Sequence, residues 1–254
     1  MDTVLAVDIG NTRTKIGIID IHNLICKKKS IVNSSENKSI FHTVNTFLKQ
    51  YPEIKTNPLK ISSTIKSKVR DIQSFLNSRR NIYRIDVLRY HSHLPIKSSY
   101  IKPENLGTDR IANCLFGLKK YPGTNCIIIS AGTATTIDIL SNNCEHLGGY
   151  ILPGIQTKIK SLYSNTADLP MVNTADNQYS HIFPPNSTES GIYNGVVLEQ
   201  SGGISFIIKK VLETIPGDYK ILVCGGEWKF IKPYIKFSFF EYPDLTLIGT
   251  GLFE

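Results

Sequence analysis

The sequence predicts an α/β protein built from two related halves. The main observation is a repeated pattern, in which an apolar strand, a turn rich in Gly and Thr and a second strand occur from residue 4 and again from residue 125. A second observation is that segments with the apolar spacing of helices follow each pair of strands. We therefore expect one half over residues 1–120 and the other over residues 121–254.

The first half opens with strands expected over residues 4–9 and 15–20. Both segments are rich in β-branched residues, and the Gly10-Asn11 pair between them favours a tight hairpin turn. Apolar spacing then predicts helices, and a short apolar run predicts a further strand. The expected helices cover residues 40–51, 69–77 and 108–118, and the expected strand covers residues 59–64.

The second half begins in the same way, with strands expected over residues 125–130 and 134–140. A long helix over residues 190–214 and a short strand over residues 220–224 follow, and the strand ends at Gly225-Gly226. These glycines either admit the adenine or ribose of a nucleotide close to the backbone or only end the strand. Because each half starts with a hairpin whose turn has room for a phosphate group, we expect a nucleotide in the cleft between the halves.

Composition and charge narrow the classes of function. The net charge of +8 fits a nucleic-acid partner or an enzyme with anionic substrates, but the lysines are scattered apart from short clusters such as Lys27–Lys29. They lie in no nucleic-acid motif, so we expect no nucleic-acid partner. Five cysteines without a Cys-x-x-Cys pair predict reduced thiols. Without a signal peptide or an apolar run of about 18 residues, the chain is expected to be soluble, cytoplasmic and not associated with membranes.

The turn that follows the first strand carries the first candidate site. Gly10 lets the backbone approach a ligand closely, and Asn11, Thr12 and Thr14 offer hydrogen-bond donors to phosphate oxygens. Asp8, at the end of the strand, is placed to hold a magnesium ion through water. A plain hairpin turn would also contain Gly-Asn for backbone reasons alone.

The second turn offers a similar set of donors. Thr133, Thr135 and Thr136 follow Gly132 and supply hydroxyl and amide groups for a second phosphate contact. Threonine is also common in strands because β-branched residues suit them. Two such hairpins at the starts of two halves are more specific than either one, and no Gly-Lys-Ser/Thr follows, as it would in a P-loop.

A third candidate lies just before the helix expected over residues 108–118. Gly107-Thr108 precedes the helix, so Asp109 and Arg110 lie in its first turn. A carboxylate at this end of a helix is favoured in its ionised form and can accept the proton of a substrate hydroxyl that attacks phosphorus. The alternative is a structural helix cap with a local arginine pair.

These motifs resemble those of the type III pantothenate kinases, and they occur in the order in which that family has them. The matching segments are Asp8-x-Gly10-Asn11-Thr12, Tyr100-x-x-Pro103, Gly107-x-Asp109-Arg110, Gly132-Thr133-Ala134-Thr135-Thr136-x-Asp138 and Gly149-x-Ile151-x-Pro153-Gly154. The resemblance implies an actin/hexokinase-like (ribonuclease H-like) duplicated fold with a nucleotide cleft between two halves. It also implies ATP-dependent phosphorylation of pantothenate to 4'-phosphopantothenate, the first step of coenzyme A biosynthesis.

The resemblance further implies roles for single residues. The residues that would bind ATP are Asp8, Ile9, Gly10, Asn11, Thr12, Arg13, Thr14, Lys15 and Thr133. Those that would bind pantothenate are Tyr100, Gly107, Thr108, Asp109, Arg110 and Thr188, with Asp109 as the general base. Kinases of this family are homodimers whose pantothenate pocket is completed across the interface, and they use Mg²⁺ and usually K⁺ or NH₄⁺.

One position departs from the pattern of the family. Two residues before the second turn the family has an aspartate that holds the monovalent cation, and this chain has Ser130. A serine hydroxyl is a neutral and weaker ligand for a hard cation than a carboxylate, so no site for that cation is assigned.

Two other functions fit the same residues. The first is a kinase of the same fold with a sugar or acetate as the acceptor, since one fold hosts many functions. The second is a non-catalytic regulator that binds nucleic acid through its positive charge. Only the stretch from Tyr100 to Arg110 argues for pantothenate over other acceptors.

Overall fold

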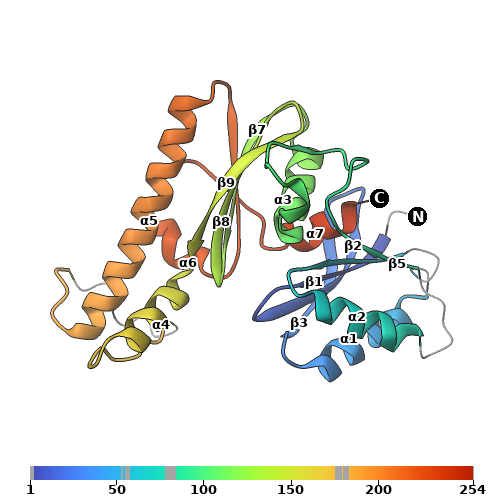
Figure 1. The fold of residues 1–254 in the computed structure, drawn as a ribbon, viewed down its shortest axis with the longest axis horizontal. Helices are drawn as coiled ribbons and strands as arrows, with labels where there is room; N and C mark the ends of the chain where they lie inside the picture. Colours follow the sequence, from blue (N-terminus) through green and yellow to red (C-terminus); the bar gives the residue numbers. More distant parts are fainter. Residues whose placement is uncertain are drawn as a thin grey trace. The chain divides into compact units, whose positions relative to one another are not determined.

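The computed structural model describes residues 3–52, 54, 58–77, 84–174, 179 and 183–253. The chain forms two compact units of mixed strands and helices (Figure 1). The first consists of Met1–Cys126, Asp138–Gly148 and Asp244–Glu254, and the second of Ile127–Ile137 and Gly149–Pro243.

A five-stranded sheet with the order β3-β2-β1-β4-β5 lies in the first unit. Its strands are β1 (Thr3–Ile9), β2 (Arg13–Asp20), β3 (Ile25–Asn33), β4 (Leu59–Ser63) and β5 (Ile85–Val87). The first three are antiparallel neighbours, whereas β4 pairs in parallel with both β1 and β5. The expected opening hairpin and the expected strand over residues 59–64 are therefore confirmed.

The helices of this unit are α1 (Asn37–Gln50), α2 (Lys66–Asn77), α3 (Thr108–Lys120) and α7 (Leu245–Leu252). The first three confirm the helices predicted from apolar spacing, whereas α7 was not predicted. No helix in the described part of the chain is long and apolar enough to cross a lipid bilayer.

The alternation of side chains along β1 gives the sheet two different faces. Leu5, Val7 and Ile9 point to one face and join a buried core with apolar residues of α1 and α2. Asp8 lies between Val7 and Ile9 in the sequence, so its side chain points to the opposite face. Lys15 of β2 is its direct cross-strand partner on that face.

Helix α7 covers the face to which Asp8 points. Its Gly251 lies against Val4 and Ile19, which share that face. Its Gly249 lies against α3, where an added Cβ would come within 1.9 Å of the Ala112 carbonyl oxygen. Only glycine leaves room for this approach of two helices, and α3 is thereby held on the same face as Asp8.

The second sheet repeats the strand order of the first. Its strands are β6 (Lys97–Ser98), β7 (Asn125–Ala131), β8 (Ala134–Leu140), β9 (Glu145–Pro153), β10 (Tyr219–Cys224) and β11 (Phe240–Glu241). The full order is β11-β10-β7-β8-β9-β6. Read from β9, the series β9-β8-β7-β10-β11 corresponds to β3-β2-β1-β4-β5, with β6 added at the edge. The repeated pattern in the sequence therefore reflects a repeated topology.

Three helices of the second unit pack together: α4 (Ile155–Asn165), α5 (Thr188–Thr214) and α6 (Trp228–Ile231), with α5 in contact with both others (Figure 1). Helix α5 confirms the long helix expected over residues 190–214. It begins with a capping box, in which Ser187 and Ser190 exchange hydrogen bonds between side chain and backbone. Helix α4 was not predicted.

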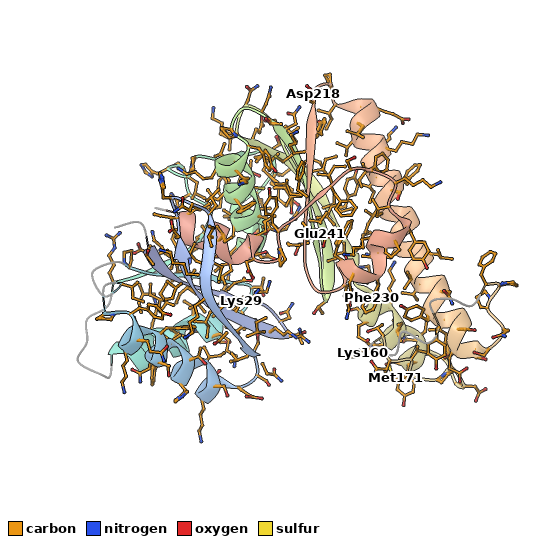
Figure 2. The ribbon with its side chains drawn as sticks, turned by 180° about the vertical axis from the view of Figure 1, so that it is seen from behind. Lys29, Lys160, Met171, Asp218, Phe230 and Glu241 are labelled. Carbon is orange, nitrogen blue, oxygen red and sulfur yellow. The ribbon has the colours of Figure 1, made fainter. Side chains whose placement is uncertain are left out.

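The lysine cluster that raised the question of nucleic acid lies on β3. Lys27 pairs with Asp20 at 3.0 Å, and Lys29, labelled in Figure 2, pairs with Asp244 at 2.7 Å. Both acidic partners belong to the same unit as the lysines. Part of the positive charge of this cluster is therefore neutralised within the fold.

Candidate active site

The turn between β1 and β2 is short and leaves little room for a side chain at residue 10. The Gly10 N–H donates a hydrogen bond to the Arg13 carbonyl oxygen at 3.1 Å, and a Cβ on Gly10 would lie 3.1 Å from the same oxygen. The side chains of Asn11, Thr12 and Arg13 are exposed at the tip of the turn. The first turn therefore presents polar side chains to solvent, as a phosphate-binding turn requires.

Two other residues of this segment lie in the interior. Ile9 and Thr14 are fully buried, and the Thr14 hydroxyl is hydrogen-bonded to the Ser34 hydroxyl at 2.9 Å. Their side chains support the turn from within, so any contact of these two residues with a ligand would come from the backbone.

Asp109 lies in the first turn of α3, where Gly107 is the N-cap residue. An added Cβ on Gly107 would come within 2.6 Å of Asp109 Oδ1, so the absence of a side chain at 107 makes room for the carboxylate. Thr108 fixes this end of the helix to β4: its hydroxyl accepts hydrogen bonds from the Ser63 N–H at 3.0 Å and the Ser62 hydroxyl at 3.1 Å. The Thr108 hydroxyl keeps its own proton for a further partner.

Both Asp8 and Asp109 have a raised pKa, and burial is the main cause for each. Burial raises the pKa of Asp8 from 3.8 to about 7, the positive charge of Lys15 opposes this rise, and the nearby Asp109 adds to it. Burial also raises the pKa of Asp109, while the Arg110 backbone N–H and guanidinium oppose the rise and Asp138 adds to it. Carboxyl groups perturbed in this way are typical of proton acceptors and cation ligands.

Tyr100 and Arg110 form a pair next to Asp109. Arg110 Nη1 donates a hydrogen bond to the Tyr100 hydroxyl at 2.6 Å, and Nε donates to Asp138 Oδ1 at 2.8 Å. Arg110 is buried, whereas Tyr100 is half-buried and lines a surface cavity of about 520 Å³ together with Lys102. The pair brings a phenol hydroxyl next to the Nη1 group of a guanidinium, and two such groups together suit an anionic group.

The second turn lies in the other unit and resembles the first. The Gly132 N–H donates to the Ala134 carbonyl oxygen at 3.1 Å, as Gly10 does to Arg13. The Thr133 carbonyl oxygen accepts hydrogen bonds from the Gly154 N–H at 3.0 Å and the Thr157 hydroxyl at 2.7 Å. The Thr133 side chain is exposed, whereas Thr135, two residues further on, is buried. Of these two threonines, Thr133 is the one whose side chain is open to a ligand.

Glu227 supports this second turn and was not predicted from the sequence. Its carboxylate accepts hydrogen bonds from the Ile155 N–H at 2.7 Å and the Gln156 N–H at 3.1 Å, and so caps the start of α4. Its own N–H donates to the Ala131 carbonyl oxygen at 3.0 Å. Gly225 has a φ of +97° and lies so close to Ala131 that any side chain would clash. Gly225 therefore lets the chain pass directly against the backbone of Ala131.

The two remaining positions of interest also lie in the second unit. Thr188 is the first residue of α5, directly after the N-cap Ser187, and its side chain is exposed. Ser130, near the end of β7, is half-buried.

A magnesium site built from protein groups alone is not present in the described residues, where no three His, Cys, Asp or Glu side chains converge. Magnesium does not need such a group, because it is commonly bound by one or two carboxylates together with water and phosphate oxygens. Asp8 fits this role, since a cation would offset the charge that burial disfavours.

A duplicated α/β fold with a turn containing Gly and Thr between the first two strands of each half is that of the actin/hexokinase-like proteins, and solved structures agree. An activator of 2-hydroxyisocaproyl-CoA dehydratase from Clostridium difficile with bound ADPNP matches with a TM-score of 0.57 and 12% identity, covering 98% of this chain and 93% of that one. A ROK hexokinase from Thermus thermophilus matches with a TM-score of 0.52 and 10% identity, covering 98% and 97%. These likenesses confirm the expected fold.

Sequence comparison identifies the family. A family model described as type III pantothenate kinase matches residues 4–210. A type III pantothenate kinase of Christiangramia forsetii is 30% identical over 248 residues, which cover 96% of this chain and 95% of the relative. The chain belongs to the type III pantothenate kinase family, as the motifs of the sequence predicted.

Proposed function

We propose that this chain transfers the γ-phosphoryl group of ATP to the primary hydroxyl of pantothenate and releases 4'-phosphopantothenate and ADP. Membership of the family supports this reaction. The observation that carries it is the placement of Asp109, a half-buried carboxylate with a raised pKa in the first turn of α3. A raised pKa makes a carboxylate a stronger proton acceptor at the pH where it is still ionised.

In the proposed mechanism Asp109 orients the hydroxyl and accepts its proton as the oxygen attacks the γ-phosphorus. The new bond joins the pantothenate oxygen to phosphorus, and the bond between phosphorus and the β–γ bridging oxygen breaks, with no covalent enzyme intermediate. Catalysis of this kind depends mainly on positioning and on stabilisation of charge. The exposed groups of the first turn and of Thr133 would bind the phosphates.

Tyr100 and Arg110 are proposed to bind the carboxylate of pantothenate. The Nε edge of Arg110 is occupied by Asp138, so a bidentate contact through that edge is not open. The contact would instead use Nη1 of Arg110 and the Tyr100 hydroxyl, which accepts from Nη1 and keeps its own proton to donate. Gly107, Thr108 and Thr188 are proposed to complete the pantothenate site.

Magnesium, when bound, would neutralise phosphate charge, and Asp8 is the residue proposed to hold it, directly or through water. For a monovalent cation such as K⁺ or NH₄⁺, the position of the family's carboxylate is taken by Ser130, a weaker ligand. We therefore propose that any activation by K⁺ is weak. The test is to measure kinase activity in K⁺ and in Na⁺, and the two activities should be similar.

The broader setting is also proposed from the family. We propose a cytoplasmic homodimer with two ribonuclease H-like halves, residues 1–120 and 121–254. The repeated strand order of the two sheets supports the duplication. Sedimentation of the purified protein would test the dimer.

The experiment that tests the function measures ADP release and the mass of the product with ATP and pantothenate. Glucose and acetate as acceptors separate this function from that of a kinase for another substrate. Turnover of ATP with pantothenate, and with neither glucose nor acetate, supports the proposal. Turnover with glucose or acetate but not with pantothenate contradicts it. If the protein instead slows the migration of DNA in a gel, in a salt-dependent way, and turns over no ATP, the result favours a non-catalytic regulator that binds nucleic acid.

A further inference from the structure

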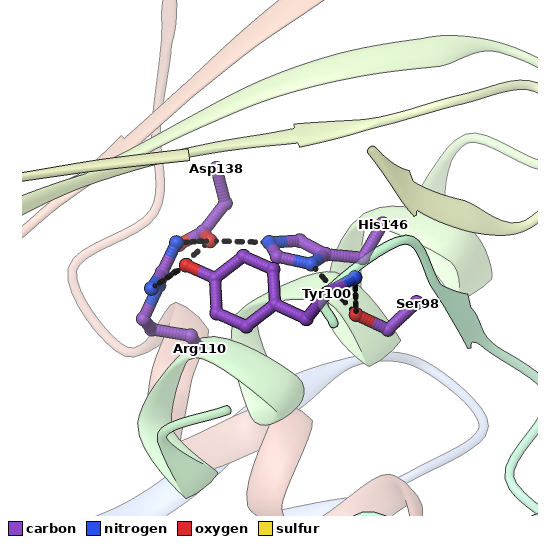
Figure 3. A network of polar contacts seen from close by, with 5 residues as sticks. All are labelled: Ser98, Tyr100, Arg110, Asp138 and His146. Atoms are coloured by element: carbon purple, nitrogen blue, oxygen red, sulfur yellow. Dashed lines mark hydrogen bonds and ion pairs between the residues drawn. The ribbon is translucent and has the colours of Figure 1, made fainter. Parts of the chain in front are cut away.

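A buried polar network connects β8 and β9 to the Tyr100–Arg110 pair (Figure 3). At its centre is Asp138, which is fully buried in β8. Its Oδ1 accepts a hydrogen bond from Arg110 Nε at 2.8 Å and lies 2.8 Å from His146 Nε2. Arg110 Nη2 also lies 2.6 Å from Oδ1, as an ion pair without hydrogen-bond geometry.

The network continues from His146 to Tyr100. Because Nε2 of His146 faces a carboxylate, the proton on Nε2 leaves Nδ1 to accept from the Ser98 hydroxyl, 3.3 Å away. The Ser98 oxygen in turn accepts from the Tyr100 N–H at 3.2 Å. The rings of Tyr100 and His146 also pack edge to face, with centroids 5.2 Å apart. His146 therefore holds Tyr100 by its backbone and by its ring.

Stability alone is a poor explanation for this arrangement. Three charged or polar side chains are buried together, with exposures of 0% for Asp138, 0% for His146 and 4% for Arg110. Buried ion pairs generally stabilise a fold no better than apolar residues of the same volume. Moreover, Asp138 Oδ2 is buried without a hydrogen-bond partner in the described part of the chain, which is unfavourable. What the network achieves is a fixed orientation of the Arg110 guanidinium and the Tyr100 phenol.

We propose that Asp138 and His146 are positioning residues for binding of the acceptor. Asp138 engages one edge of the Arg110 guanidinium and turns Nη1 toward the Tyr100 hydroxyl, while His146 fixes Tyr100 and orients Asp138. The result is two adjacent donors, one from Arg110 and one from Tyr100, aimed at the carboxylate of the acceptor. This inference rests on the proposed function, because it takes pantothenate as the acceptor.

The test compares His146→Leu, His146→Gln and the control His42→Leu, since His42 is exposed on α1. For His146→Leu we expect KM for pantothenate to rise on the order of tenfold, which is about 1.4 kcal/mol, while kcat and KM for ATP change less than twofold. Gln can still donate to Asp138, so His146→Gln should recover most of the loss. His42→Leu should match the wild type.

A second arm asks whether His146 acts through Arg110 and Tyr100. If it does, His146→Leu introduced into a background that carries both Arg110→Lys and Tyr100→Phe should change KM for pantothenate less than twofold. Full additivity, or a loss of kcat with KM unchanged, would overturn the proposal. If His146→Leu does not fold, Ser98→Ala decides: it removes the Nδ1 partner, and an unchanged KM for pantothenate would contradict the role of His146.

Calorimetric titration with pantothenate separates this inference from the proposed function. A wild type that binds pantothenate but forms no phosphorylated product contradicts the reaction, and weaker binding by His146→Leu would still support positioning. A wild type that neither binds nor phosphorylates pantothenate overturns both. A wild type that phosphorylates pantothenate, with His146→Leu indistinguishable from it, overturns positioning alone.

Discussion

Replacing Asp8 by Asn should stabilise the protein and at the same time abolish most of its activity. Asp8 is the last polar residue of β1 and points to the face that α7 covers, where burial disfavours its charge. Its pKa is raised from 3.8 to about 7. At neutral pH, ionisation of Asp8 therefore costs more free energy in the folded state than in the unfolded state, and the charge destabilises the fold. Asparagine has a similar shape without the charge.

The expected gain can be worked from the pKa. At about 1.4 kcal/mol per pH unit, the change from 3.8 to about 7 corresponds to an upper limit of roughly 4 kcal/mol. Residual solvent access to the half-buried side chain reduces the expected gain to about 1–3 kcal/mol. At about 2–4 °C per kcal/mol for a chain of this size, Tm should rise by several degrees.

The sign of the pH dependence follows from proton binding. Between pH 4 and 7 the folded state keeps the Asp8 proton more than the unfolded state does, so the contribution of Asp8 to stability falls as pH rises. The difference in Tm between Asp8→Asn and the wild type should therefore grow from pH 4 to pH 7 and change little above pH 7. Differential scanning fluorimetry over this range measures it.

The control is Asp218→Asn, an exposed aspartate in the turn between α5 and β10 that is labelled in Figure 2. It should shift Tm by less than 1 °C at any pH, because exposed substitutions of this kind have small effects. Turnover of Asp8→Asn with ATP and pantothenate should fall by on the order of 10². A Tm difference that is negative, or independent of pH, would show that the burial of Asp8 does not carry the penalty inferred here.

Three further variants test other parts of the site. Asp109→Asn should lower kcat by about 10²–10⁴ and leave the circular dichroism spectrum unchanged, because a proton acceptor is removed without loss of shape. Gly107→Ala places a Cβ 2.6 Å from Asp109 Oδ1 and should lower kcat about tenfold, whereas Gly202→Ala, with no atom within 4 Å of the added Cβ, should not. Glu227→Gln removes the charge at the start of α4 and replaces one of its two accepting oxygens with an NH₂ group, which leaves a backbone N–H of Ile155 or Gln156 without an acceptor, so urea unfolding should show a loss of about 1–3 kcal/mol.

Elements with strong apolar patterns could be predicted from the sequence. The segments of β1, β2, β7 and β8 are β-branched and continuous, and their repetition gave the duplicated topology. Helices α1, α3 and α5 have apolar residues at helical spacing, and α5 also has Ser187 and Ser190 at its start. In each case local preference and tertiary packing agree, which is the condition under which such predictions succeed.

Helix α7 shows where local preference fails. Its sequence, Leu245–Leu252, is apolar with Thr and two glycines, and such a segment has low helix propensity. The glycines are needed because Gly249 meets the backbone of α3 and Gly251 meets Val4 and Ile19. Tertiary packing overrides propensity here, and a single sequence does not reveal the partner against which a segment packs. Strand β3 was missed for a different reason, since its central Lys27–Lys29 breaks the apolar alternation.

The candidate site could be proposed from the sequence only where its residues lie close together along the chain. Asp109 and Arg110 follow Gly107 within three residues, and Gly10 lies two residues after Asp8. His146 and Glu227 could not be predicted, because their partners are distant in sequence: His146 contacts Ser98, and Glu227 caps Ile155. The His146 contact depends on the register between β6 and β9, and the Glu227 contact depends on how the start of α6 packs against the start of α4, neither of which local patterns specify.

The first turn of α3 positions both the proposed base and the proposed carboxylate-binding residue of the acceptor site. Asp109 and Arg110 are consecutive residues of α3, so their side chains leave the helix about 100° apart. Asp109 lies close enough to Asp8 to raise its pKa, and Arg110 is held by Asp138 on another side. The helix itself cannot slide, because Thr108 is hydrogen-bonded to β4 and Gly249 of α7 packs against it. A shift of α3 by one residue in one direction would place the carboxylate of Asp109 against Asp138, and a shift in the other direction would place the guanidinium of Arg110 beside Asp8. The hydrogen bond of Thr108 to β4 and the packing of Gly249 against α3 therefore keep Asp109, the proposed base, and Arg110, the proposed carboxylate-binding residue, in separate environments.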